Sequence, residues 1–150
     1  MNETGNQKEY VTAMIGGQLF GLPILQVQDV FVPERVTRVP LAPQDIHGIL
    51  NLRGRIVTLI DMRNRLGLPP REGGKVMALG VEQRGESYGL LIDSVGEVFK
   101  ADDATREPNP INLDPRLGSV SAGIHRLEGQ LLIVLNVDRV LDIGRPAMAA

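Results

Sequence analysis

GILNLRGRIVTLID, the sequence of residues 48–61, returns as GIHRLEGQLLIVLN at residues 123–136, shifted by 75 residues without a gap. The glycines and most apolar positions are kept between the two copies, whereas Arg53 becomes Glu128. Positions that both copies share are expected to build a common structural unit, and positions that differ are where a specialised role would lie. The duplication decides the fold class, because two similar units in one chain are expected to fold alike.

The duplication extends upstream of these stretches. Residues 20–30, FGLPILQVQDV, align with residues 88–98, YGLLIDSVGEV, at a shift of 68 residues. The change from 68 to 75 indicates a net insertion in the second copy, most easily in the proline-rich stretch 101–123. Two copies are too few for a solenoid. We therefore expect one domain, 10–144, of two repeats (about 10–67 and 75–144) packed about a pseudo-twofold axis. Whether strands are exchanged between the two units stays open.

The composition is that of a compact protein with a substantial core. Of the 150 residues, 43% are hydrophobic and 23% are charged, and a chain of this length buries roughly 70% of its unfolded surface. Cysteine is absent, which excludes disulfides and thiolate metal sites and fits a cytoplasmic location. The formal net charge of −2 argues against nucleic-acid binding. No apolar run is long enough to span a membrane, so we expect no direct membrane insertion.

Segments rich in branched residues predict a mainly β protein, and the many short strands favour two small β-barrels. The expected strands are residues 11–15, 20–32, 49–52, 55–60, 75–82, 88–99, 124–127 and 130–135. Residues 68–74 are expected to connect the repeats, and residues 1–9 and 145–150 to form flexible tails.

Short helical turns are expected at residues 43–47, 62–66 and 137–141. Asp61 and Asn136 precede the last two, at positions where a side-chain oxygen can accept an otherwise unpaired backbone N–H.

The tetrapeptide LRGR at residues 52–55 predicts a two-residue hairpin loop. Such a loop needs a positive φ at one or both central positions, which Gly54 adopts readily, so Arg53 is held outward at the tip. A solvated turn residue and a recognition residue both fit this placement. The planar donor fork of arginine suits partner recognition, and the change to Glu128 in the second copy favours that interpretation slightly.

No catalytic constellation is visible in the sequence. The two histidines, His47 and His125, are not repeat equivalents, and each is expected to be an ordinary surface or loop residue. No serine lies in a Gly-X-Ser-X-Gly context. We therefore expect no enzyme activity, no metal and no cofactor.

The residues also resemble a known family. GILNLRG at residues 48–54, followed by DMR at 61–63, is similar to the signature of the CheW family, the coupling proteins of bacterial chemotaxis. Further matching stretches are residues 36–40, 88–98 and 132–137. The resemblance covers about residues 10–141, although Thr58 stands where the family often has proline.

This resemblance implies two five-stranded SH3-like β-barrels and an adaptor function. CheW-like proteins bind the regulatory domain of the histidine kinase CheA and the cytoplasmic tips of methyl-accepting chemoreceptors. The implied location is the cytoplasm, with recruitment to membrane-associated receptor arrays. Coupling of this kind needs two surfaces in a fixed relation, so that a shift in the receptor changes the population of active kinase.

The resemblance also implies partner-binding residues. Arg53 looks like the family's signature arginine, and Asn51 and Gly54 would support its turn. Val95 and Val98 match positions that face the groove for the receptor's helical tip, a mode of binding that uses apolar anchors. Burial in the core is an equally good interpretation of both valines.

A second group of implied contacts precedes the hairpin. Asp29 sits where the family usually carries glutamate, on a surface associated with partner binding, and Phe31 would add an exposed apolar contact to the kinase. Val27 is the repeat counterpart of Val95, and burial in the core is again the alternative.

Two other functions stay open at this point. A CheW-like scaffold of another chemosensory pathway, such as surface motility or gene regulation, would have the same fold. A small-barrel ligand-binding protein is the other alternative, and it would require a concave polar site.

Overall fold

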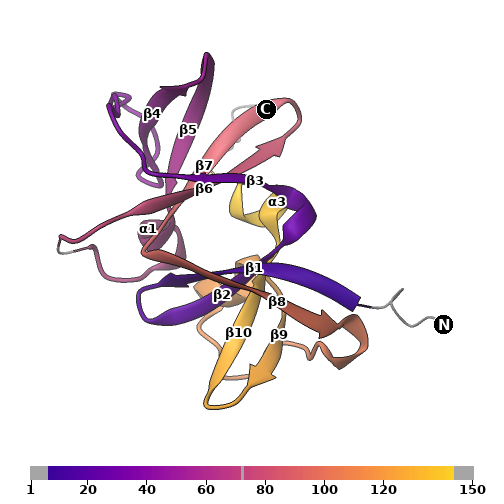
Figure 1. Cartoon of the computed structure of the whole chain (residues 1–150). Helices are drawn as coiled ribbons and strands as arrows, with labels where there is room; N and C mark the ends of the chain where they lie inside the picture. Colours follow the sequence, from indigo (N-terminus) through magenta and orange to yellow (C-terminus); the bar gives the residue numbers. More distant parts are fainter. Residues whose placement is uncertain (1–6, 72, 144–150) are drawn as a thin grey trace.

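The computed structural model describes residues 7–71 and 73–143 and consists mainly of β-strands (Figure 1). The strands are β1 (Gln7–Ile15), β2 (Gln18–Pro23), β3 (Val27–Phe31), β4 (Ile46–Leu52), β5 (Arg55–Asp61), β6 (Met77–Gln83), β7 (Glu86–Ile92), β8 (Ser94–Asp102), β9 (Ser121–Leu127) and β10 (Gln130–Leu135). Sheet A has the order β8-β1-β2-β10-β9, and sheet B the order β3-β6-β7-β5-β4. The predicted fold class is confirmed, with one difference: the end strands of each described sheet form no ladder with each other, so neither barrel is closed.

The two sequence repeats exchange strands between the sheets. Sheet A combines β1 and β2 of the first repeat with β8, β9 and β10 of the second, and sheet B combines β6 and β7 with β3, β4 and β5. The register follows the sequence shift, because adding 68 residues carries the pair Ile15–Gln18 onto Gln83–Glu86. The β4–β5 and β9–β10 hairpins lie at opposite ends of the molecule (Figure 1).

The chain passes between the sheets twice, within the two stretches that were each predicted as one strand. Residues 20–32 divide into β2 and β3 around a 3₁₀ turn at Ile24–Gln26, and residues 88–99 divide into β7 and β8 at Asp93. Both predicted strands are therefore wrong in length, because residue type does not show where a strand changes partners. Pro23 ends β2, and it has no backbone N–H to offer a ladder.

Two predicted helices and their caps are confirmed. Helix α1 (Met62–Leu66) follows Asp61, whose carboxylate accepts the backbone N–H three residues later at 3.2 Å, and it ends at Gly67 with a φ of 73°. Helix α3 (Val137–Val140) follows Asn136, whose side-chain oxygen accepts in the same way at 3.1 Å.

The helical turn predicted at residues 43–47 is wrong. The amide of Ile46 donates to the carbonyl three residues earlier at 2.9 Å, which closes a turn, and β4 begins at the same residue. Pairing of Ile46 with Ile60 of β5 outweighs the local helix signal. Helix α2 (Pro115–Val120), which follows its cap Asp114, was not predicted and lies within the expected insertion.

Both sheets bury their facing sides in one core. Its fully buried side chains include Phe20, Leu22, Ile60, Leu79, Leu90, Ile124, Ile133 and Leu135. None of the described helices is long and apolar enough to cross a membrane. Of the predicted tails, residues 7–9 belong to β1 and pair with β8, while residues 1–6 and 145–150 lie outside the described residues.

Candidate functional site

The β4–β5 hairpin holds Arg53 at its tip as the sequence predicts. Leu52 pairs with Arg55, and both loop residues are left-handed, with φ of 53° at Arg53 and 84° at Gly54. The side chain of Asn51 supports the turn, because its Oδ1 accepts the Gly54 N–H at 2.9 Å. A left-handed non-glycine residue is strained, and the hairpin compensates that strain through Asn51 and the flanking ladder.

Arg53 meets Asp29 across the sheet. An Nη of Arg53 donates to Asp29 Oδ2 at 3.2 Å, although the two residues are 24 positions apart. The side chain of Arg53 is 71% exposed, so the pair contributes little to stability and leaves most of the guanidinium donors open. Asp29 can lean toward the hairpin because it pairs with Gly80 of β6, where an added Cβ would collide with the Asp29 carboxylate.

A hollow of about 300 Å³ opens beside this ion pair on sheet B. Its apolar lining comes from Phe31, Leu52, Val57, Val81 and Tyr88, and its polar lining from Gln28, Asp29, Arg53, Arg55 and Ser87. The hollow has an apolar floor and charged groups of both signs at its rim. Such a site can bind one apolar side chain of a partner protein, with polar groups of the same partner at the rim.

The structure corrects two of the implied contacts on β3. Phe31 is buried, at 9% exposure, and packs in the floor of sheet B, so it is not the exposed contact that was expected. Val27 is partly buried and packs against the shared core, which fits its core interpretation. Val30 is the exposed apolar residue of this strand, and sequence reasoning missed it because strand faces were assigned without a register.

Val95 and Val98 lie on β8, an edge strand of sheet A. They are 38% and 47% exposed, so the alternative of core burial is wrong for both. Val98 pairs with Val11 and Val95 with Ala13, so β8 carries one extra residue between them. Such a bulge shifts the alternation of faces by one and places both valines on one side of the strand.

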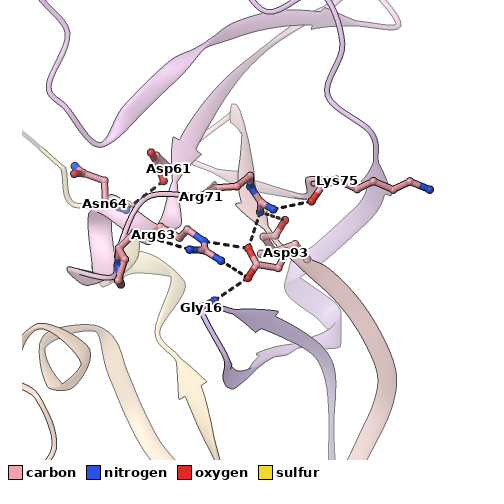
Figure 2. A network of polar contacts seen from close by, with 9 residues as sticks. Gly16, Asp61, Arg63, Asn64, Arg71, Lys75 and Asp93 are labelled. Atoms are coloured by element: carbon pink, nitrogen blue, oxygen red, sulfur yellow. Dashed lines mark hydrogen bonds and ion pairs between the residues drawn. The ribbon is translucent and has the colours of Figure 1, made fainter. Parts of the chain in front are cut away.

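A polar network that sequence reasoning missed centres on Asp93 (Figure 2). Its carboxylate accepts hydrogen bonds from Arg63, Arg71 and the backbone N–H of Gly16. Burial raises the pKa of the Asp93 carboxyl, but the hydrogen bonds and charges of these partners outweigh it and hold the pKa below its usual value. Arg63, the arginine of the DMR stretch at residues 61–63, belongs to this network.

His125 is buried rather than on the surface, with 3% exposure. Its ring lies 5.8 Å from that of Tyr10 and 5.7 Å from that of Phe99, measured between centroids. Burial, followed by the nearby charge of Arg106, lowers the pKa of His125, and acidic neighbours oppose that only in part. The prediction of a surface residue failed because burial of β9 depends on sheet pairing.

Among the described residues, no group of three or more His, Cys, Asp or Glu side chains could hold a metal ion. Two apolar surfaces, the hollow on sheet B and the valines of β8 on sheet A, lie on separate sheets, each of which combines strands of both repeats. These features define the class of a small adaptor or scaffold.

Comparison with known proteins identifies the family. The chain matches the CheW-like domain family over residues 9–144. Proteins named chemotaxis protein CheW from Helicobacter pylori and Rhizobium meliloti are 28% and 27% identical, over 89% and 91% of this chain and 81% and 89% of theirs. The crystal structure of the scaffolding protein TtCheW from Thermoanaerobacter tengcongensis matches with a TM-score of 0.84 at 29% identity, covering 95% of this chain and 92% of that one. The chain belongs to the CheW-like domain family and is an adaptor of chemotaxis signalling.

Proposed function

We propose that this chain couples methyl-accepting chemoreceptors to the histidine kinase CheA by binding each on a separate surface. The observation that carries the proposal is the exposed Arg53, held at a rigid hairpin tip beside an apolar hollow. The proposed setting is the cytoplasm, at membrane-associated receptor arrays. The chain acts there as a scaffold without catalysis of its own.

The hollow on sheet B is the proposed kinase surface. One apolar side chain of the CheA regulatory domain enters it, and the open donors of Arg53 bind a carboxylate or carbonyl at its rim. Asn51 and Gly54 act through the turn, and Asp29 holds the guanidinium in place. Phe31 forms part of the floor of the hollow. Val27 packs against the shared core, and the bulge in β3 places Val30 on the same side of the strand as Val27, away from Asp29 and Phe31.

The exposed side of β8 is the proposed receptor surface. Val95 and Val98 lie on one side of an edge strand and present two apolar anchors to the helical tip of a receptor. The two surfaces lie on different sheets, so one copy of the chain has room for both partners. A shift of the bound receptor then changes the kinase through the scaffold between them.

The test is titration calorimetry of the full chain with the regulatory domain of CheA from the same organism. Arg53→Glu is compared with Arg84→Glu, a matched control, because Arg84 occupies the tip of the β6–β7 hairpin with a φ of 54°. We expect Arg53→Glu to weaken binding by about tenfold or more, as at an interface hot spot, and Arg84→Glu to leave it unchanged. Circular dichroism confirms that both variants are folded.

Each other outcome of this titration is informative. If Arg53→Glu and Arg84→Glu weaken binding equally, the loss of affinity comes from the change in net charge, and Arg53 is not part of the interface. A wild-type chain that binds neither the regulatory domain nor a receptor-tip fragment would contradict the proposed function. Binding only to the kinase of another chemosensory pathway would assign the chain to that pathway.

A further inference from the structure

Asp93 is the single residue that joins the two sheets at the second crossover. It lies between the last residue of β7 in sheet B and the first residue of β8 in sheet A. Its backbone N–H donates to the carbonyl of Met14 in β1 at 2.9 Å. Val95, the first exposed valine of the proposed receptor surface, follows two residues later. Whatever fixes Asp93 therefore fixes the start of β8.

The Asp93 carboxylate is bound from three directions (Figure 2). Arg63 of α1 donates from Nε to Oδ1 at 3.2 Å and from an Nη to Oδ2 at 2.8 Å. Arg71 of the connector donates to Oδ1 at 2.6 Å, and the N–H of Gly16 in the β1–β2 turn donates to Oδ2 at 2.8 Å. The carboxylate thus ties the β1–β2 turn of sheet A to the helix that follows β5 of sheet B.

The two arginines are themselves anchored to the backbone. Arg63 also donates to the carbonyl of Pro69 at 2.9 Å, and Arg71 donates to the carbonyls of Lys75 at 2.7 Å and Ile92 at 3.3 Å. The connector between the repeats is therefore held against the crossover. The side chains of Arg63, Arg71 and Asp93 are each only about one-fifth exposed. Charge-assisted hydrogen bonds between such partly buried groups fix the relative positions of the groups better than a solvent-exposed ion pair does.

The fold itself does not require this network. At the pseudo-twofold equivalent crossover the position of Asp93 is taken by Leu25, which is 96% exposed, and the position of Arg63 by Asp138. Leu25 cannot accept a hydrogen bond through its side chain, and a 3₁₀ turn carries the chain between the sheets instead. The same topology is thus built once with the network and once without it.

We propose that Asp93, held by Arg63 and Arg71, is a positioning residue that sets β8 and its exposed valines relative to the Arg53 surface on sheet B. The inference rests on the proposed function, because it assigns to the network the fixed relation that coupling requires. Release of the carboxylate frees the start of β8 while the hairpin and the hollow keep their shape.

The test measures binding of both partners to the full chain. Asp93→Asn removes the charge with little change in volume, and Glu107→Gln is the matched control, since Glu107 accepts from Arg126 at 2.9 Å far along the chain from the crossover. We expect Asp93→Asn to weaken binding of a receptor-tip fragment by about fivefold to tenfold, within the usual range of coupling effects. Binding of the CheA regulatory domain stays unchanged, and Glu107→Gln changes neither affinity.

The outcomes separate this inference from the proposed function. If the wild type binds both partners and Asp93→Asn changes neither affinity, the inference is overturned and the proposed function stands. If both affinities fall in the same proportion, Asp93 only supports stability and the inference is also overturned. Should Asp93→Asn be unfolded at the working temperature, Arg71→Gln replaces it, because that change leaves both bonds from Arg63 in place.

The distance between two spin labels on the folded chain reports the position of β8 and does not depend on overall stability. The chain has no native cysteine, so spin labels can be attached after Lys100→Cys on β8 and Arg84→Cys on the β6–β7 turn. We expect the distribution of distances between the labels to broaden or shift with Asp93→Asn and to stay as in the wild type with Glu107→Gln. An unchanged distribution with Asp93→Asn would overturn the positioning role.

Discussion

Sheets A and B are built from the same pattern of strands, yet the positions that line the hollow beside Arg53 on sheet B carry side chains of different volume in sheet A. Three of the residues that line the hollow have markedly larger counterparts in sheet A. The pairs are Gly80 and Thr12, Ser87 and Leu19, and Val57 and Leu132. In sheet A, Leu132 is fully buried and packs with Leu19, Tyr10 and Phe99.

Within the paired strands, the two repeats differ in side-chain volume and not in register. The register of the strands is the same in both sheets, so these three differences in volume arise without a change of topology. Charge diverged at the same place, since Arg53 corresponds to Glu128. At that second tip only Gly129 of the two loop residues has a positive φ, so the turn itself differs as well.

The largest expected effect comes from one pair of equivalent aromatic residues. Phe20 is fully buried in the shared core, whereas its counterpart Tyr88 lines the hollow. We expect Phe20→Ala to lower the free energy of unfolding by about 3–5 kcal/mol, and Tyr88→Ala to lower it by less than half of that. Urea denaturation followed by circular dichroism measures both changes. Equal losses would show that the hollow is packed as tightly as the core.

The second-largest effect is expected when Gly80 of sheet B is replaced by threonine, the residue at the equivalent position 12 of sheet A. In Gly80→Thr the new Cβ collides with the Asp29 carboxylate, so the Arg53–Asp29 pair separates and the hollow narrows. We expect a loss of stability of about 1–3 kcal/mol, typical of overpacking, and a much weaker affinity for the CheA regulatory domain. Calorimetry measures the second effect.

The reciprocal change is the control for this substitution. Thr12→Gly removes the hydrogen bond from Thr12 Oγ1 to the carbonyl of Glu97, which is 2.6 Å long, and loosens β8 instead of the hollow. It therefore leaves kinase binding in place while it lowers stability. Loss of kinase binding in Thr12→Gly as well would break the assignment of the kinase surface to sheet B.

The smallest expected effect is a pH dependence confined to sheet A. Burial lowers the pKa of His125 in the folded chain, so below about pH 6.5, the ordinary histidine value, the unfolded chain takes up a proton that the folded chain resists. Stability therefore falls as the pH falls from about 7 toward 5. Position 125 corresponds to position 50 of sheet B, which is Leu50. We expect His125→Leu to remove the contribution of His125 to the dependence of stability on pH. Chemical denaturation at several pH values measures it, and an unchanged slope would contradict the assignment.

Much of this architecture could be predicted from the sequence. The duplication predicted two related β units, and the caps at Asp61 and Asn136 and the turn at Arg53 followed from local chemistry that depends on a few neighbouring residues. The exchange of strands could not be predicted, because a repeat in sequence is the same whether a strand pairs within its own copy or with the other. The open barrels follow from pairing and were missed for the same reason.

The site was predictable only where it depends on one hairpin. Arg53, Asn51 and Gly54 were placed correctly at the tip, but burial of Phe31 depends on strands far away in sequence. The Asp93 network was missed because its partners lie 77, 30 and 22 residues away. Such distances leave no local pattern to find.

The most direct test of the account asks whether one copy of the chain binds both partners at once. The full chain is mixed with a receptor-tip fragment and the CheA regulatory domain, and the complexes are sized by sedimentation velocity. Since the two surfaces lie on different sheets, we predict a ternary complex in which each partner binds at least as well as it does alone. Competition, in which the receptor fragment displaces the regulatory domain, would contradict the account, because it would place both partners on one surface.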